Sequence, residues 1–412
     1  MSPAVGGGFG GKTPAEPDYV LVAAIARYLG EPVSWTQTRT ENLLTMQARG
    51  HVFDVVLEAT DDGVVKSLQV LATSDLGAYP GTGIGMAMTA RTLATGVYDI
   101  PHVTYDIRGV VTNTSPVGPF RGAGRPEAIQ WIERAMDHLA ARLDLDPVEV
   151  RRRNLIKPEQ FPYVNATGQE YDSGNYAKAL DEALRLADYD SLRQEQRSRH
   201  EKGDDLLLGI GVSVYVENSA AFPDFQAEYA SLEVDDDGQV TVVAGTSAHG
   251  QGHWTTYAQI VSSTLGVPVE SINFVQSDTV RVRQGAGTGG SRSAQVGGSA
   301  VRRAADEVLE QARAVAAGVL EASTADIEVV PGEGLGVRAV PGQVLSWSQL
   351  AVAVRDDRVR SPKLAPRLFA DQDSTREAAP HPSAPTSWSS RSTERRGWRR
   401  FGAWWRSTTA AS

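Results

Sequence analysis

The sequence predicts an α+β fold made of two lobes. Segments with the alternating pattern of strands and segments with the spacing of helices follow one another without strict β-α-β order. The 412 residues are enough for two or three domains of roughly 150 residues each. A polar stretch at 157–173 separates two runs of elements. We therefore expect lobes at 1–165 and 166–373, followed by a tail at 374–412.

The composition excludes several kinds of chemistry in this chain. It has no cysteine, which excludes disulfides, thiolate zinc sites, cysteine nucleophiles and cysteine-held iron–sulfur clusters. A net charge of −10 argues against general nucleic-acid binding. No apolar run approaches the roughly 18 residues of a membrane span, and the N-terminus lacks the segments of a secretion signal. We expect a cytoplasmic protein without a membrane span.

The elements of the first lobe follow from caps, turns and periodicity. Asp18 and Gly30 are suited to begin and end a helix at 18–29. The turn Asp61-Asp62-Gly63 joins two apolar alternating segments. Apolar residues three and four apart predict a long helix from Pro126 to Leu143. The predicted strands are 33–36, 52–57 and 64–72.

The same signals predict the strands and helices of the second lobe. A helix is expected at 176–187 and, after a charged segment, the strand pattern resumes. The turn Asp235–Gly238 joins two of the strands. A glycine-rich loop at 285–298 lies between two further helices. The predicted strands are 209–216, 225–234 and 239–244, and the helices are 255–265 and 301–320.

The last forty residues differ in composition from the rest. Residues 374–412 hold half of the eight tryptophans, many arginines and few acids, and they show no hydrophobic period. One interpretation is a disordered basic tail. The other is translation in a shifted reading frame, because disordered tails are poor in aromatic residues.

Gly6-x-Gly8-x-x-Gly11 matches the dinucleotide-binding fingerprint literally. A Rossmann site, however, needs a strand before the motif and a helix starting inside it. Only five residues precede Gly6, and Pro14 and Pro17 interrupt an immediate helix. The run of glycines still permits close approach of the backbone to a bulky ligand.

A second motif is the segment 246–253, between a strand and a helix. His249 and His253 have the spacing of a zinc-binding helix, but Gly250 and Gly252 disfavour a helix there. The alternative is that backbone N–H groups at the start of the following helix bind an anion such as a phosphate. A plain turn between strand and helix remains equally open.

Two further loops share these features. Residues 285–293 combine glycines and hydroxyls with Arg292, whose guanidinium could form two parallel hydrogen bonds to a phosphate. Residues 119–126 combine glycines with Arg121 and Arg125. Each loop alone could be a structural turn. Together, the glycine-rich loops are better explained by one large ligand that carries phosphate.

In these loops the sequence resembles the molybdenum hydroxylases, namely the large subunits of the xanthine dehydrogenase, aldehyde oxidase and aerobic carbon monoxide dehydrogenase family. The similar segments keep the family's order and cover roughly residues 4–373. They are 6–12, 38–42, 120–128, 151–156, 249–259 and 287–294.

The resemblance implies the family's two-lobed molybdopterin-binding fold and a molybdopterin cofactor, often its cytosine dinucleotide form. The molybdenum is held by the pterin, with no side-chain ligand. The expected reaction hydroxylates an aldehyde or an N-heterocycle with oxygen from water. Electrons would leave through a small [2Fe–2S] subunit and a medium FAD subunit, since this chain itself would hold neither group.

The resemblance also implies roles for individual residues. Phe9 and Gly10 would face the molybdenum, Arg121 would lie near the substrate, and Gly290 would flank the metal. The cofactor would be bound by residues of three loops. These residues are Gly8, Phe9, Gly10, Gly250, Gln251, Gly252, Thr288, Ser291, Arg292 and Ser293.

Three departures from the family pattern limit this expectation. Carbon monoxide dehydrogenases have a cysteine where this chain has Gly122, so we do not expect copper–molybdenum chemistry. The lobe that precedes the first motif in the family is missing. No glutamate of this chain can be assigned as the family's general base. The alternative function is therefore an inactive fragment of such a subunit, started internally and ended by a frameshift near residue 374.

Overall fold

The computed structural model has two compact units. The first unit runs from Phe9 to Glu217 and includes strand β13. The second unit contains 5–8 and the described residues from 219 to 375. The boundary at Glu217 falls later than the 165/166 boundary expected from the sequence. The structure describes residues 5–13, 16–217, 219–220, 227–340, 342–359, 364–375 and 399–401.

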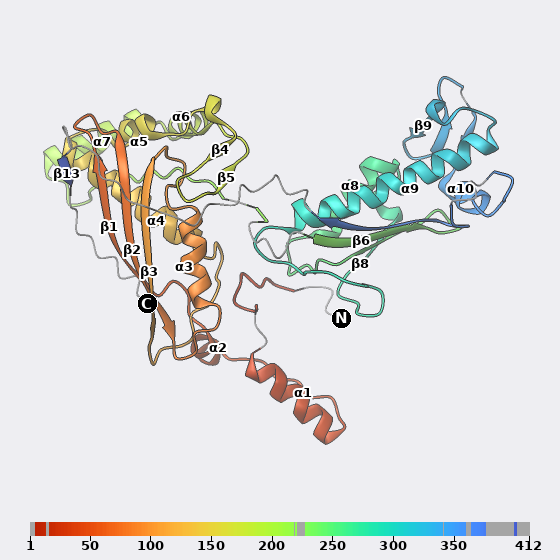
Figure 1. Ribbon diagram of the computed structural model, residues 1–412, viewed down its shortest axis with the longest axis horizontal. Coiled ribbons are helices and arrows are strands. Elements are labelled where there is room, and N and C mark those ends of the chain that lie inside the picture. The colour runs from red at the N-terminus through yellow and green to blue at the C-terminus, as the bar shows by residue number, and fades with distance from the viewer. Residues whose placement is uncertain are drawn as a thin grey trace, which may run out of the picture. The chain divides into compact units, whose positions relative to one another are not determined.

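A four-stranded sheet forms the centre of the first unit, with strand order β13-β1-β2-β3 (Figure 1). β1 (His51–Ala59) and β2 (Val65–Gly77) form an antiparallel hairpin across the predicted turn. β3 (His102–Val111) lies parallel to β2 and is reached through helix α3 (Gly83–Thr92). β13 (Arg399–Phe401) pairs antiparallel with β1. Every second residue of β1 is buried, which is the pattern of a sheet with one covered face.

Four further helices of this unit follow β3 in the chain. They are α4 (Arg125–Leu143), α5 (Pro147–Asn154), α6 (Tyr176–Ala187) and α7 (Tyr189–Lys202). Trp131 of α4 is buried against the sheet, and each fully buried apolar side chain of this kind contributes about 1.5–3 kcal/mol. Helix α6 buries Tyr176 and Leu180 in the same core, so this helix belongs with the first unit rather than with the second.

The second unit is built around another four-stranded sheet, with order β12-β6-β7-β8. β6 (Ala227–Val234) pairs antiparallel with β7 (Val240–Ala244), and β8 (Ile272–Val275) lies parallel to β7. β12 (Leu368–Thr375) pairs antiparallel with β6. Helices α8 (His253–Leu265) and α9 (Gly298–Val319) cover one face of the sheet (Figure 1). Alanines on α9 allow close packing, and those that are fully buried are Ala300, Ala304, Ala305, Ala312 and Ala316.

The two units repeat one arrangement. In each, a hairpin is followed by a crossover helix, by a third strand parallel to the second, and by a long helix. The second and third strands point the same way, so the loops that follow them lie at one edge of the sheet. These loops are 78–82 and 112–124 in the first unit, and 245–252 and 276–292 in the second.

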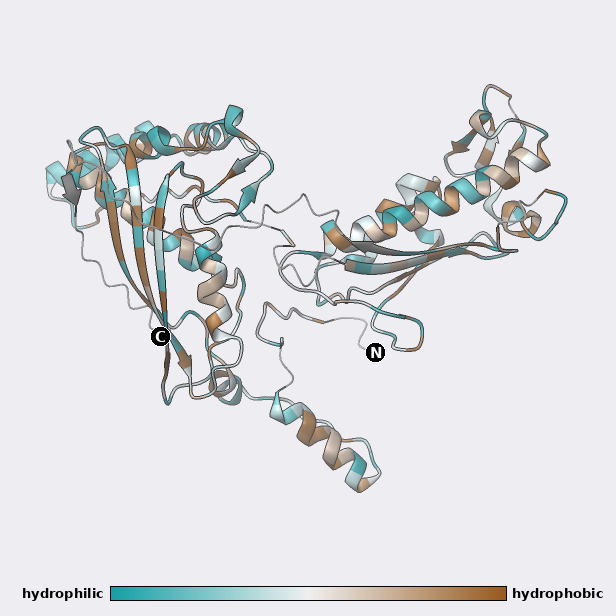
Figure 2. Ribbon diagram, viewed as in Figure 1, coloured by the Kyte–Doolittle hydropathy of each residue, from teal (hydrophilic) through white to brown (hydrophobic). Residues whose placement is uncertain are grey.

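The remaining elements lie around these two cores. They are α1 (Pro17–Leu29), α2 (Arg39–Thr45), the short pair β4 (Tyr163–Val164) and β5 (Glu170–Tyr171), the small sheet of β9 (Ile327–Val330), β10 (Gly334–Val337) and β11 (Val344–Leu345), and α10 (Trp347–Ala353). Helix α1 is apolar along much of its length and buries no residue (Figure 2). No helix among the described residues combines the length and the apolarity needed to cross a membrane.

The α+β class is confirmed, and the predicted long helices form within a few residues of the expected bounds. Two predicted strands are wrong. Residues 33–36 form neither strand nor helix, and 209–216 run without a hydrogen-bonded neighbouring strand. Val212, Val214 and Val216 do alternate onto the first core, which is why their pattern resembled a strand. The predicted tail at 374–412 lies outside the described residues, apart from 374–375 and β13.

Candidate functional site

Two glycine-rich loops of the second unit lie against each other. One loop joins β7 to α8, and the other precedes α9. A Cβ atom on Gly245 would be 2.7 Å from the Cα of Gly285, and one on Gly285 would be 2.5 Å from the Gly245 carbonyl oxygen. No side chain fits at either position, so the two glycines allow the backbones to meet. This contact brings 245–252 and 285–293 together, as expected if the two loops bind one large ligand.

Hydroxyl groups connect these loops further on. The Ser247 N–H donates to Thr288 Oγ1 over 3.1 Å, and Ser293 Oγ donates to the same oxygen over 3.2 Å. Tyr257 of α8 donates to the Ser293 carbonyl over 2.9 Å. Thr288 and Ser293, both expected to contact the cofactor, therefore lie at the junction of the loops. Their hydroxyls order this junction through bonds within the protein.

The first glycine motif contributes a third segment to the second unit. A Cβ atom on Gly8 would lie 3.4 Å from His249 Nδ1, and one on Gly250 would lie 2.5 Å from the Val5 carbonyl oxygen. The segment 5–8 is thus packed beside 249–250. It is not a strand, and α1 begins only at Pro17, so the described part of the motif lacks the context of a Rossmann site.

The start of α8 has the properties of an anion-binding site. Gly252 occupies the N-cap position with a positive φ of 78°, and no side chain in the described part of the chain caps the helix. The first N–H groups of a 13-residue helix are therefore available, and the helix dipole favours negative charge there. A Cβ atom on Gly252, Gly287 or Gly289 would meet no atom of the described residues within 4 Å. Open space beside these backbones is what a phosphate-bearing cofactor requires.

Arg292 has a different environment from the one expected. Its side chain is 2% exposed and forms an ion pair with Glu228 of β6, whose side chain is 0% exposed. The guanidinium also donates to the Gly287 and Ala227 carbonyls, over 2.6 and 2.5 Å. These partners occupy the guanidinium and attach the loop to the sheet. Arg292 thus shapes the loop, and the geometry does not favour the bidentate phosphate contact that we predicted.

Gly290 and Ser291 lie at the turn of the same loop. The Gly290 carbonyl accepts a hydrogen bond from the Ala220 N–H over 3.0 Å. Ser291 has a positive φ of 57°, a conformation that few side-chain-bearing residues adopt. The turn is held in one shape by these features, between Thr288 and the start of α9.

The other predicted residues belong to the first unit. Phe9 lies in a tight turn, and the Arg121 guanidinium stands 5.7 Å from the centre of its ring. Gly10 lies against the Pro119 carbonyl, where a Cβ atom would be 2.4 Å from the oxygen. The structure therefore brings Phe9, Gly10 and Arg121 together, although more than a hundred residues separate them in the sequence. A cation over an aromatic face is worth about 0.5–1 kcal/mol at an exposed position.

A buried polar cluster that sequence reasoning missed lies beside this turn. Arg49 donates to the Arg121 carbonyl over 2.5 Å and stands 4.0 Å from Glu127. His51 Nε2 lies 3.7 Å from the same carboxylate. Burial raises the pKa of Glu127 and lowers that of His51 to about 4. An inward-facing histidine on the otherwise apolar, buried face of β1 was the available signal.

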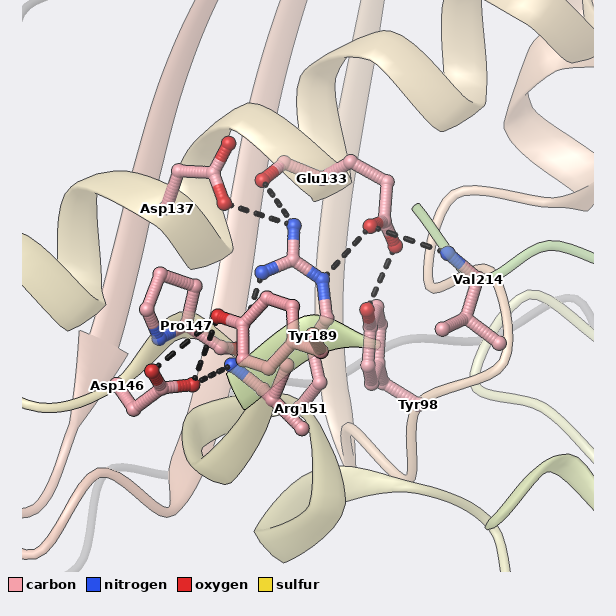
Figure 3. Close-up of polar contacts among 9 residues, drawn as sticks. Tyr98, Glu133, Asp137, Asp146, Pro147, Arg151, Tyr189 and Val214 are labelled. Carbon is pink, nitrogen blue, oxygen red and sulfur yellow. Dashed lines mark hydrogen bonds and ion pairs between the residues drawn. The ribbon is translucent and has the colours of Figure 1, made fainter. Parts of the chain in front are cut away.

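A second buried network lies around Arg151 of α5 (Figure 3). Its guanidinium pairs with Glu133 over 2.9 Å and with Asp137 over 2.8 Å, both on α4. Glu133 also accepts hydrogen bonds from Tyr98, over 2.6 Å, and from the Val214 N–H, over 3.2 Å. The network therefore joins α4, α5 and the extended segment 209–216. Its fully buried arginine is satisfied within the protein, so we read it as structural.

Comparison with known protein families identifies the family to which this chain belongs. Residues 1–155 and residues 182–387 each match a model described as a molybdopterin cofactor-binding domain. The chain belongs to the molybdenum hydroxylase large-subunit family. The second match extends past Asp373, where we expected similarity to the family to end.

Individual relatives within the molybdenum hydroxylase family agree. The chain is 38% identical to the carbon monoxide dehydrogenase large chain of Hydrogenophaga pseudoflava, over 80% of this chain and 43% of that one. It is 35% identical to the nicotine 6-hydroxylase large subunit of Paenarthrobacter nicotinovorans, over 88% and 46%. The structure of quinoline 2-oxidoreductase from Pseudomonas putida 86 matches with a TM-score of 0.83 and 31% identity, over 91% and 49%. The chain spans about half the length of these relatives.

Proposed function

We propose that this chain binds a molybdopterin cofactor through the paired loops of its second unit and acts as the cofactor-binding part of a molybdenum hydroxylase. The observation that carries the proposal is the junction of 245–252 with 285–293, beside an uncapped helix N-terminus and open space. Backbone N–H groups at the start of α8 would bind phosphate. Gly8, Gly250 and Gln251 would line the same cradle.

Bound in this way, the molybdenum would supply the two-electron oxidation that adds a water-derived oxygen to carbon. This chain's residues would bind and orient the reactants. Phe9 provides an apolar ring, and the exposed Arg121 guanidinium beside it could donate a hydrogen bond to a nitrogen or oxygen atom of the substrate. An aldehyde or an N-heterocycle is the substrate class we propose. Relatives named for nicotine and quinoline support the heterocycle.

The loop around Gly122 supports a reaction other than carbon monoxide oxidation. Gly122 has a φ of 97°, and a Cβ atom there would lie 2.4 Å from Cγ of Pro126. A cysteine at this position would be strained and would collide with the proline ring. The cytosine dinucleotide form of the cofactor, electron transfer to [2Fe–2S] and FAD subunits, and a cytoplasmic location remain predictions.

Cofactor release and turnover test this proposal. The full chain is expressed in a host that makes both molybdopterin and its cytosine dinucleotide form, and the purified protein is treated with acid. We expect release of cytidine monophosphate together with an oxidised pterin. Dye reduction by aldehydes and N-heterocycles then separates an active subunit from an inactive one. Cofactor without turnover would support the inactive alternative, and a folded chain without pterin would contradict the proposal.

A further inference from the structure

A buried histidine, His253, directly follows the glycines of the loop 245–252. His253 is the first residue of α8 and is 4% exposed. Its ring stacks on Tyr257, with centroids 5.2 Å apart and an interplanar angle of 25°. Tyr257 is itself fixed by hydrogen bonds to Thr246 and to the Ser293 carbonyl. The imidazole is therefore held in one orientation by the junction of the two loops.

The neighbouring Gln251 amide lies between two nitrogen atoms. The backbone N–H of His249 is 2.6 Å from Gln251 Oε1, and His253 Nε2 is 3.1 Å from Gln251 Nε2. A backbone N–H can only donate, so the atom facing it must be the amide oxygen. Rotating the amide by 180° would place two donors 2.6 Å apart. The contact with His249 thus fixes which way the amide points.

This orientation determines the state of the histidine. Gln251 Nε2 can only donate hydrogen bonds, so the His253 Nε2 that faces it must accept one. The proton of a neutral His253 must then sit on Nδ1, which is buried and has no hydrogen-bond partner among the described residues. A doubly protonated ring would turn an N–H toward the amide N–H₂ group and break the contact. Burial and then the neighbouring His249 lower the pKa of His253, which favours the neutral ring that the geometry requires.

We propose that His253, as the neutral Nδ1–H tautomer, is a positioning residue that holds the Gln251 amide as a hydrogen-bond donor at the surface of the cofactor loop. One Nε2 hydrogen of Gln251 is used on His253, and the second remains for an oxygen acceptor of the cofactor. The identity of that acceptor rests on the proposed function. The tautomer and the amide orientation do not, because they follow from contacts within this chain.

Ring-nitrogen NMR of the full chain labelled with 15N-histidine tests the proposal without any cofactor. The His253 signals are those lost in His253→Gln. We expect the wild-type ring to be protonated at Nδ1 and unprotonated at Nε2. A wild-type ring protonated at Nε2 would overturn the proposal.

A matched pair of variants gives an independent test. In Gln251→Glu, one carboxylate oxygen still accepts from His249, and the other faces His253 Nε2 and demands a proton there. We expect the ring to become protonated at Nε2. Gln276→Glu is the control, since Gln276 accepts from the Ala248 N–H in the same loop region. It should leave the His253 signals unchanged. An unchanged ring in Gln251→Glu would contradict the mechanism.

The positioning role has a readout in cofactor retention. His253→Phe keeps a ring to stack on Tyr257 but removes the acceptor for Gln251. We expect retained pterin to fall on the order of tenfold, as loss of an orienting partner commonly does at cofactor sites. Retention equal to wild type would overturn the role. Absence of pterin from the wild-type chain would instead count against the proposed function and leave the NMR result standing.

Discussion

The ion pair between Arg292 and Glu228 gives the sharpest prediction about how the loop 285–293 is held. Both side chains are almost completely buried, and Arg292 also donates to two backbone carbonyls. Replacing Arg292 with methionine keeps much of the volume but leaves the Glu228 carboxylate buried without its counter-ion. Breaking a buried pair in this way costs about 3–5 kcal/mol. Domains are stable by only about 5–15 kcal/mol, so the second unit should lose much of its stability.

Urea unfolding followed by circular dichroism measures this cost. The double variant Glu228→Gln with Arg292→Met removes both charges, and we expect it to be clearly more stable than Arg292→Met alone. Arg302→Met is the matched control, because Arg302 pairs with Asp306 on the exposed side of α9 and should cost about 0.5 kcal/mol or less. The reasoning is refuted if Arg292→Met costs no more than Arg302→Met, or if the double variant is as unstable as the single one.

Three further predictions concern the first unit. The pKa of His51 is about 4 in the folded chain and 6.5 ordinarily, which corresponds to about 3 kcal/mol in the free energy of unfolding. This stability is fully present above pH 6.5 and is lost as the pH falls toward 4, because the unfolded chain takes up the proton first. His51→Gln should flatten this part of the pH–stability curve, whereas His102→Gln, at an exposed position, should not. Arg151→Leu should destabilise the unit by about 3–5 kcal/mol in urea unfolding, since it leaves Glu133 buried without its partner; a loss below 1 kcal/mol would contradict a structural role. Leu21 is 57% exposed on the apolar helix α1, so Leu21→Lys should reduce hydrophobic-dye binding and self-association. Its free energy of unfolding should change by about 0.5 kcal/mol or less. Unchanged dye binding would contradict the prediction that α1 provides the exposed apolar surface.

Local sequence patterns were sufficient for much of the fold. The 3.6-residue period located α4, α6 and α9, and the turn at 61–63 located the first hairpin. These features depend on residues close in the chain. The segment 209–216 shows the limit, because an alternating pattern predicts which side chains face the core but not whether another strand is there to pair.

The candidate site was predictable as a set of loops but not as a set of side-chain roles. Glycines beside helix starts indicated where a ligand could approach, and the structure brings the loops of the second unit together. The ion pair of Arg292 could not be predicted, because its partner, Glu228, lies 64 residues earlier in the chain. The cluster of Arg49, His51 and Glu127 was missed for the same reason. Pairing across such distances is set by the fold, and the inward-facing position of His51 indicated a polar site but not its partners.

The measurement that tests the central claim most directly is the molybdenum and pterin content of the purified full chain. We expect about one of each per chain. Gly289→Asp should lose both. A Cβ atom at Gly289 meets no described residue within 4 Å, so the side chain fits, but the new carboxylate would repel phosphate. Gly209→Asp, at an equally open position in the first unit, should keep both. A folded wild-type chain without cofactor, or equal retention in the two variants, would contradict the account.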